Sequence, residues 1–210
     1  LADQPNQHGR HPLPSADSWL AQVRTWGIKN KDQIVVYDDA GGSFASRAWW
    51  MMRWLGHENV AVLDGGVNNW PESLTPAAAG IEAAEPSDYQ SHTPLTKLSS
   101  VEAVVDLSRA LSNKALNGSE ILLDARAEAR FSGAEEPIDP VAGHIPGAIC
   151  APFGDNLDTK GFFKSPEQLA RRFLELGLDP TKTAQAITAY CGSGVTATHN
   201  ILALRIAGFG

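Results

Sequence analysis

Two stretches of the chain carry the same pattern of apolar and polar positions. In residues 15–27 the apolar side chains recur at helical spacing behind Ser15, and serine is a favoured helix N-cap. Residues 165–177 repeat this pattern behind Ser165. After each stretch come a polar turn, a short apolar segment, a glycine-containing loop and an apolar helix that ends at glycine. The chain therefore contains two copies of one helix, strand, loop and helix pattern.

Short apolar strands alternate with the expected helices. We place strands at residues 34–37, 121–124 and 186–189. Helices that alternate with short buried strands are typical of α/β units around a mainly parallel sheet. The predicted fold class is therefore α/β, with two tandem domains, each a mainly parallel sheet flanked by helices.

The two copies differ in what precedes and follows the shared pattern. The strand at 121–124 has no counterpart before residue 11, and the first copy continues through residues 60–66 whereas the second stops at Gly210. We therefore expect both chain ends to be truncated. Between the copies the sequence is rich in Pro, Ala, Ser and Thr without a sustained period, which is typical of a connection. The predicted division is a partial N-terminal domain over 1–75, a linker over 76–97 and a C-terminal domain over 98–210.

Charge and hydropathy exclude two classes of partner. The formal net charge is −7 and the pI is about 5.3, without a cluster of Lys and Arg that would neutralise phosphates. The longest apolar stretch, at residues 48–55, is interrupted by Arg53 and is far shorter than the ~20 residues that cross a bilayer. We expect neither a nucleic acid nor a membrane as partner.

The cysteines are too few for a disulfide scaffold. Cys150 and Cys191 are the two in the chain, and neither has a second cysteine or a histidine at zinc-finger spacing. This favours a reducing compartment, which we take to be the cytoplasm, and predicts no metal and no cofactor. We expect Cys150 to be a buried thiol at a strand end.

The segment from Tyr190 to Ala197 follows an expected strand and opens a helix. Backbone N–H groups in a tight glycine-containing loop converge on one point, and a helix N-terminus adds about half a positive charge. Such a site favours the thiolate form of a cysteine at its first residue, which would make Cys191 a nucleophile. The alternative is that Cys191 is a small buried hydrophobic residue.

The loop sequence Cys-Gly-Ser-Gly-Val-Thr-Ala resembles the active-site loop of the 3-mercaptopyruvate sulfurtransferase branch of the rhodanese family. Further segments match the family, namely Asp124-Ala125-Arg126, Arg130-Phe131, Gly143 to Ala148, Leu63-Asp64-Gly65-Gly66 and Trp70. The resemblance implies tandem rhodanese domains, of which the first is inactive and the second catalytic. Consistent with this, the repeat aligns Asp39 with Cys191, although Asp38 and Asp39 are equally compatible with the start of a turn.

The resemblance also implies a mechanism. The Cys191 thiolate takes a sulfur atom from 3-mercaptopyruvate, pyruvate leaves, and the Cys191 persulfide passes the sulfur to a thiophilic acceptor such as cyanide or a reduced thiol, which can belong to a protein. Two steps through a covalent intermediate predict ping-pong kinetics. The main-chain amides expected to hold the persulfide are those of Gly192, Gly194, Val195 and Thr196.

Three side chains receive roles from the same resemblance. Arg130 matches a family arginine that holds the acidic group of the donor, for which a planar guanidinium is suited, and the alternative is that Arg130 forms a surface ion pair. Ser193 and His11, the latter in a His-Pro-Leu-Pro stretch, match two members of a proton relay, and the alternative from the sequence alone is that His11 is a solvated loop residue. The branch usually has a second arginine after a Glu-Pro, and here Ile138 stands in its place.

Three other functions compete with this interpretation. Thiosulfate is the alternative donor, although relatives that prefer it usually carry basic side chains where this loop has Gly192 and Ser193. A cysteine-dependent phosphatase would need an arginine six residues after the cysteine, and Ala197 stands there. A binding module without catalysis would be favoured if the nucleophile position were not cysteine.

Overall fold

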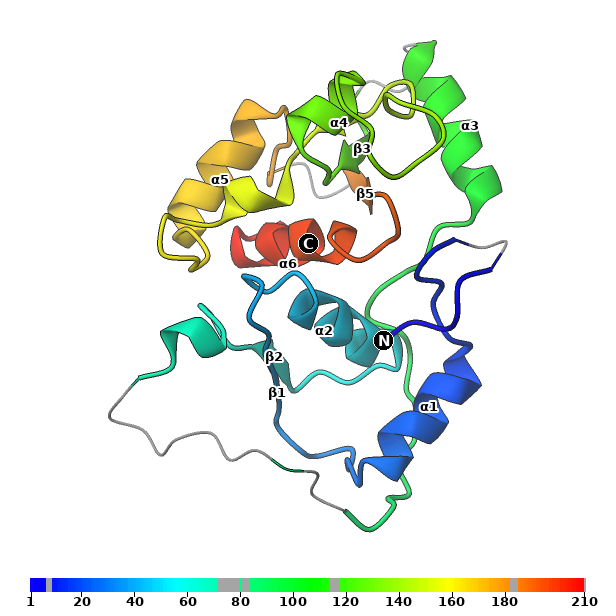
Figure 1. Ribbon diagram of the computed structural model, residues 1–210, viewed down its shortest axis with the longest axis vertical. Coiled ribbons are helices and arrows are strands. Elements are labelled where there is room, and N and C mark those ends of the chain that lie inside the picture. Colours follow the sequence, from blue (N-terminus) through cyan, green and yellow to red (C-terminus); the bar gives the residue numbers. More distant parts are fainter. Residues whose placement is uncertain (7–8, 72–79, 81–83, 114–117, 182–184, 210) are drawn as a thin grey trace. The chain divides into compact units, whose positions relative to one another are not determined.

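The computed structural model describes residues 1–6, 9–71, 80, 84–113, 118–181 and 185–209 (Figure 1). The chain divides into two compact units, Leu1–Lys97 and Leu98–Gly210, which we call unit 1 and unit 2. Each is an α/β unit with parallel strands, as the alternation of helices and strands predicted.

Unit 1 has the helix, strand, loop and helix order predicted from the pattern. Its elements are α1 (Ala16–Thr25), β1 (Ile34–Val36), α2 (Ala45–Trp54), β2 (Val60–Val62) and the 3-10 helix η1 (Val67–Asn69). Ser15 caps α1, since its hydroxyl accepts a hydrogen bond from the Ser18 N–H at 3.1 Å. β1 and β2 pair in parallel, and Trp49 and Trp50 of α2 are buried in the core of this unit.

Residues 84–97, the second half of the expected linker, belong to unit 1. Tyr89 is fully buried there, and its carbonyl accepts a hydrogen bond from Nε of Arg24 at 2.8 Å. Its hydroxyl lies 3.2 Å from Nδ1 of the buried His57. Most of the first half of the expected linker lies outside the described residues, so its role between domains stays a prediction.

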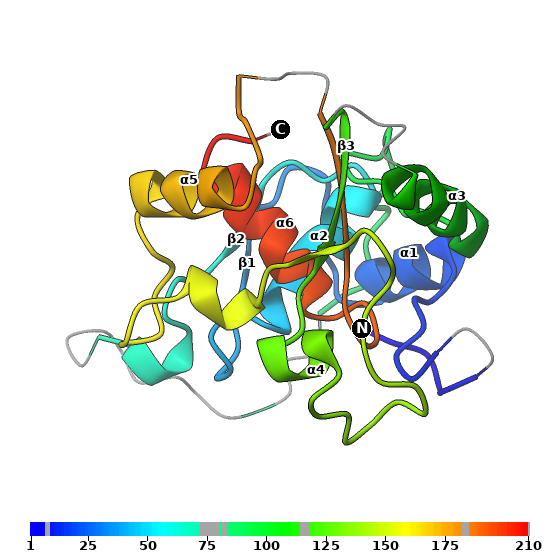
Figure 2. The same cartoon turned by 90° about the horizontal axis from the view of Figure 1, so that it is seen from above.

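Unit 2 contains a three-stranded parallel sheet in the order β4, β3, β5. Its elements are α3 (Val101–Ser112), β3 (Glu120–Asp124), α4 (Glu128–Ser132), β4 (Ile149–Cys150), η2 (Phe153–Asn156), α5 (Pro166–Glu175), β5 (Ala186–Tyr190) and α6 (Ala197–Ile206). Figure 2 shows α3 on one side of β3 and β5, and α5 with α6 on the other. This is the layering of an α/β sheet covered on both faces.

The core of unit 2 lies between the sheet and the helices α5 and α6. It is built from Ile121, Leu123, Ala151, Leu169, Phe173, Leu178, Ala203, Leu204 and Phe209. A capping box begins α5, because Ser165 and Gln168 each accept a hydrogen bond from the other's main-chain N–H. The core therefore fixes α6 against the strand that precedes the Cys191 loop.

The carboxyl ends of the three strands of unit 2 meet at one edge of its sheet. Asp124, the last residue of β3, pairs in register with Cys150 of β4 and with Tyr190 of β5. Loops that leave this edge are the usual place of ligand binding in parallel sheets. The segment after Asp124 and the loop that begins at Cys191 are thereby brought side by side.

Candidate active site

Cys191 follows the last residue of β5, and its loop leads into α6. Its Sγ accepts hydrogen bonds from the main-chain N–H of Gly194 at 3.1 Å and of Ser193 at 3.5 Å. Gly194 has φ 75°, a left-handed conformation that turns the loop back toward the sulfur. Two main-chain donors directed at one sulfur, beside the N-terminus of a ten-residue helix, stabilise negative charge on that sulfur.

The Cys191 loop borders a cavity of about 860 Å³ that is lined wholly by unit 2. Tyr190, Cys191 and Gly192 line it on the side of β5, while the opposite wall is formed by Val101, Val104 and Val105 of α3 and by residues 141–146. Arg109, Arg126 and Asp139 contribute the charged part of the wall, and Arg109 is paired with Asp106 of its own helix at 3.3 Å. Cys191 thus lines a space that admits a small molecule.

Two side chains hold the segment 143–146 against the end of β5. The Tyr190 hydroxyl accepts a hydrogen bond from the Ile145 N–H at 3.1 Å. Nη2 of Arg126 donates to the carbonyl of Gly143 at 2.6 Å. Burial raises the pKa of Tyr190, so its hydroxyl stays protonated near neutral pH. One wall of the cavity is therefore fixed to the strand that carries Cys191.

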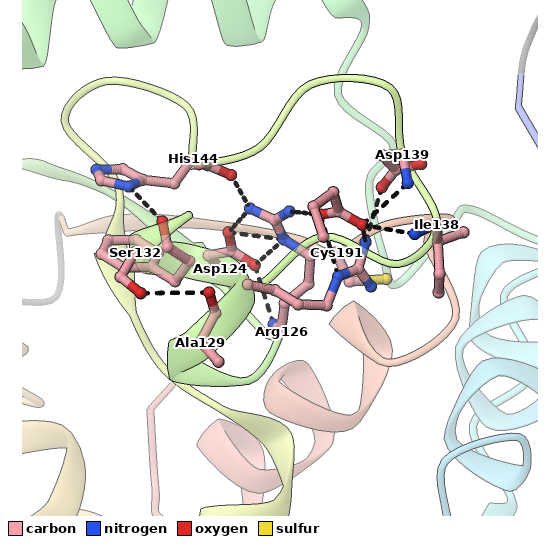
Figure 3. Close-up of polar contacts among 12 residues, drawn as sticks. Asp124, Arg126, Ala129, Ser132, Ile138, Asp139, His144 and Cys191 are labelled. Atoms are coloured by element: carbon pink, nitrogen blue, oxygen red, sulfur yellow. Dashed lines mark hydrogen bonds and ion pairs between the residues drawn. The ribbon is translucent and has the colours of Figure 1, made fainter. Parts of the chain in front are cut away.

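Arg126 is held by a buried ion pair. Its guanidinium contacts the carboxylate of Asp124 through Nε, at 3.0 Å, and through Nη2, at 2.6 Å, and the two side chains are 8% and 0% exposed. This pairing raises the pKa of Arg126 above its ordinary value. Figure 3 shows both residues beside Cys191. Because its charge is balanced and its donors are engaged, Arg126 supports the wall of the cavity.

Arg130 binds two carboxylates of the chain. Its Nη2 donates to Glu136 at 2.7 Å and to Asp139 at 2.8 Å, and its Nε donates to Glu136 at 3.2 Å. Main-chain N–H groups of Asp139 and Ile138 also donate to Glu136, and these bonds together with Arg130 lower the pKa of Glu136 to about 2. Glu136 is therefore ionised near neutral pH.

His144 braces this region through Phe131. Its Nδ1 donates to the carbonyl of Phe131 at 2.8 Å, and its ring stacks on the Phe131 ring with centroids 3.7 Å apart. The Gly-His-Ile-Pro-Gly turn is thereby joined to α4.

A buried polar cluster anchors the first turn of α6. Nδ2 of Asn156 donates to Nδ1 of His199 at 3.0 Å and to the amide oxygen of Asn200 at 2.8 Å. Asn200 in turn donates to the carbonyl of Ala151 at 2.8 Å, and all three polar residues are fully buried. These bonds join η2, α6 and the end of β4 through several buried polar groups at once, although the amide oxygen of Asn156 is buried without a hydrogen-bond partner. Here they fix the helix that follows the Cys191 loop.

The equivalent loop of unit 1 is filled by a carboxylate of the chain itself. Asp38 Oδ1 accepts hydrogen bonds from the N–H groups of Ala40 and Gly42, and its Oδ2 from those of Phe44 and Ala45, all at 2.8–2.9 Å. Burial alone would raise the pKa of Asp38, but the four main-chain bonds outweigh it and lower the pKa. The N–H groups of this loop are therefore directed at an anion, and the anion is the Asp38 carboxylate.

The repeat alignment matches Cys191 with Asp39, which is one residue after the carboxylate that fills the loop. Asp39, which it pairs with Cys191, is exposed and contacts Asn68 through its carbonyl at 2.8 Å. Asp38 thus has the turn-forming role that the sequence analysis considered for it. A run of two aspartates before a glycine pair was the signal, but it does not reveal which carboxylate turns inward.

The remaining candidates, His11, Ser193 and Cys150, lie in different parts of the chain. His11 lies in unit 1, where its carbonyl accepts a hydrogen bond from Nη2 of Arg47 at 2.8 Å, and Ser193 lies partly exposed in unit 2. Their relay stays a prediction. Cys150 is a partly buried strand-end thiol, and burial together with Glu128 raises its pKa to about 12.

Sequence reasoning did not assign three residues of this region. Asp139 and Tyr190 line the cavity, and Glu136 binds Arg126 and Arg130. The Tyr190 hydroxyl bonds a main-chain group 45 residues away, so its spacing carried no signal. Glu136 and Asp139 bind Arg130 from six and nine residues away, but spacing does not show which way a carboxylate points. Within the described residues, no group of His, Cys, Asp and Glu is arranged to hold a metal ion. In the same part of the chain no helix is both long and apolar enough to span a bilayer.

Comparison with known families now decides the assignment of the fold. The rhodanese-like domain family matches residues 4–73 and 106–210. The chain belongs to the rhodanese family. Both units therefore carry the family's pattern, and the Cys191 loop occupies the second match.

Individual relatives agree with this assignment. A Pseudomonas aeruginosa protein named "Probable 3-mercaptopyruvate sulfurtransferase" is 45% identical over 202 residues, which cover 96% of this chain and 68% of the relative. The thiosulfate sulfurtransferase of Mus musculus is 36% identical over 201 residues, which cover 93% of this chain and 64% of the relative. The chain thus spans about two thirds of the length of these relatives.

A solved structure shows the same arrangement of elements. The crystal structure of a 3-mercaptopyruvate sulfotransferase from Escherichia coli superposes with a TM-score of 0.79 at 28% identity, and the match covers 100% of this chain and 74% of that protein. The rhodanese fold is therefore shown by sequence and by structure. The sulfur donor is not decided by these matches, because relatives named for either donor are similar to the chain.

Proposed function

We propose that the protein is a sulfurtransferase that moves a sulfur atom from 3-mercaptopyruvate to a thiophilic acceptor through a persulfide on Cys191. The observation that carries the proposal is the pair of main-chain N–H groups, from Ser193 and Gly194, that donate to Cys191 Sγ at the border of the cavity. The same donors suit a thiolate before the first step and a persulfide after it.

The first step forms a sulfur–sulfur bond at Cys191. The thiolate attacks the thiol sulfur of the donor, the carbon–sulfur bond breaks, and its electron pair leaves on the enolate of pyruvate. The proton of the donor thiol is released from the new persulfide, and the enolate takes up one proton to become pyruvate. No external oxidant is needed, because the oxidation of the transferred sulfur is balanced by the reduction of the carbon that it leaves.

In the second step the acceptor attacks the outer sulfur. With cyanide the product is thiocyanate, and with a reduced thiol it is a persulfide of that thiol. In both cases the sulfur–sulfur bond breaks and the Cys191 thiolate returns. A cycle that depends on a free thiolate fits a reducing compartment, for which we propose the cytoplasm.

Support for 3-mercaptopyruvate over thiosulfate comes from the charge of the loop. Gly192 and Ser193 offer no positive side chain to the thiosulfate dianion. Thiosulfate stays the second candidate, because a thiosulfate sulfurtransferase is 36% identical to the chain. We propose unit 1 as the inactive domain, since its loop is closed by Asp38 and offers no sulfur nucleophile.

The direct test is the steady-state rate of thiocyanate formation by the full-length protein with each donor in parallel. We expect a higher kcat/KM with 3-mercaptopyruvate and no transfer by Cys191→Ser. Cys150→Ser is the matched control and keeps the wild-type rate. A higher kcat/KM with thiosulfate would overturn the donor assignment, and equal loss in both cysteine variants would remove the special role of Cys191.

The proposed relay of His11 and Ser193 has its own test. Pyruvate leaves as an enolate that needs a proton, whereas sulfite leaves thiosulfate without one. His11→Gln and Ser193→Ala should therefore lower kcat with 3-mercaptopyruvate more than with thiosulfate. Equal effects on both donors would assign these side chains to binding or structure.

A further inference from the structure

We propose that Asp139 is a specificity-determining residue, whose carboxylate competes with the acidic group of the sulfur donor for Arg130. The inference rests on the proposed function, in which Arg130 holds that acidic group. It concerns a contact inside the cavity wall, because Asp139 lines the same cavity as Cys191. Figure 3 shows Asp139 and Ile138 at the edge of the ion-pair cluster, with Cys191 nearby.

The hydrogen bonds of Arg130 account for both hydrogens of Nη2. One fork of the guanidinium, made by Nε and Nη2, holds Glu136 at 3.2 Å and 2.7 Å. The second hydrogen of Nη2, which belongs to the fork shared with Nη1, is donated to Asp139 at 2.8 Å. A carboxylate binds arginine most strongly by taking both donors of one fork. A donor molecule can therefore make this bidentate contact only when Asp139 releases Nη2.

The two carboxylates on Arg130 differ in how firmly they are held. The Glu136 side chain is 4% exposed and accepts main-chain N–H bonds from Ile138 and Asp139 in addition to Arg130. The Asp139 side chain is 28% exposed, and its main chain is tied to Glu136 by its own N–H. The carboxylate of Asp139 is therefore the more accessible of the two to solvent and to an incoming anion.

The charge of the cluster opposes an incoming anion. Arg126 and Arg130 are joined to three carboxylates, those of Asp124, Glu136 and Asp139. This set carries one more negative than positive charge, although the resemblance predicts a site for a negatively charged donor. Ile138, where relatives place a second arginine, adds no positive charge. Removal of the Asp139 charge leaves the cluster neutral and one donor of Arg130 available.

The test is the donor KM of Asp139→Asn and Asp139→Ala in the full-length protein, measured at saturating cyanide. The asparagine keeps the size of the side chain, and the alanine removes the competing oxygen. We expect KM for 3-mercaptopyruvate to fall by about three- to tenfold in both, with kcat unchanged, as for the loss of a charged competitor at a part-exposed site. Glu175→Gln, which removes the same charge from the exposed face of α5, is the control and keeps the wild-type KM.

A second measurement separates this inference from the proposed function. Pyruvate, which carries the same carboxylate as the donor, is titrated into Cys191→Ser protein with and without Asp139→Asn, and its Kd is obtained by calorimetry. Tighter binding in the double variant supports the inference even if the wild type transfers sulfur from neither donor. An unchanged or higher KM with active wild type, or pyruvate binding that does not tighten, overturns it and makes Asp139 a residue that orients Arg130.

Discussion

The anion-filled loop of unit 1 gives a prediction that the sequence repeat alone would have placed on the wrong residue. Asp38→Ala removes the acceptor of four main-chain N–H groups, whereas Asp39→Ala removes an exposed carboxylate next to it. Hydrogen bonds to a charged group contribute about 1.5 to 3 kcal/mol each. Water replaces the carboxylate at some of these part-exposed amides. We therefore expect Asp38→Ala to lower the free energy of unfolding of unit 1 by about 2 to 3 kcal/mol and Asp39→Ala to change it by less than about 0.5 kcal/mol.

The pH dependence of this loss has a definite sign. The folded pKa of Asp38 is lowered, so its contribution is complete above the ordinary aspartate pKa of about 3.9 and is lost as pH falls through the folded value. The difference between wild type and Asp38→Ala should be constant near neutral pH and should close below about pH 4.

Urea unfolding followed by tryptophan fluorescence measures the effect, because all six tryptophans of this sequence lie in unit 1. The reasoning would be refuted by equal destabilisation in the two variants. It would also be refuted by a difference that persists well below pH 4.

Three further predictions concern unit 2. At pH 8 iodoacetamide should modify Cys191 much faster than Cys150, whose pKa is raised to about 12 by burial, and peptide mapping measures both rates. Gly194→Ala places a side chain at φ 75°, which costs about 1 to 2 kcal/mol and moves an N–H away from Cys191, so kcat should fall by about tenfold or more in the thiocyanate assay. Asp124→Asn leaves the buried Arg126 charge without its full countercharge, so the free energy of unfolding should fall by about 3 kcal/mol in urea titrations. A loss of less than about 1 kcal/mol would contradict a structural role for this ion pair.

Local sequence patterns predicted most of the helices and strands. The caps at Ser15 and Ser165 and the apolar spacing behind them predicted α1 and α5 because capping is set by neighbouring residues. The strand that ends at Tyr190 and the helix that follows the Cys191 loop were predicted from their runs of apolar residues and the glycine-containing loop between them.

Two kinds of contact that shape the site could not be predicted, namely those between distant residues and those that depend on side-chain direction. The Tyr190 hydroxyl meets the Ile145 N–H, and Arg126 reaches the carbonyl of Gly143, only because parallel strands bring their ends together. The sequence offered Arg130 as a donor-binding candidate, which stays a prediction. It did not reveal that the carboxylates of Glu136 and Asp139 bind it, since an acidic residue near in sequence does not show which way its side chain points.

The central claim is that Cys191 carries the transferred sulfur, and mass spectrometry of the protein after incubation with 3-mercaptopyruvate tests it most directly. The account predicts one added sulfur atom on the peptide that contains Cys191, its removal by cyanide with an equal amount of thiocyanate, and the same result in Cys150→Ser. An added sulfur on Cys150, or none on Cys191 while thiocyanate is still formed, would contradict it.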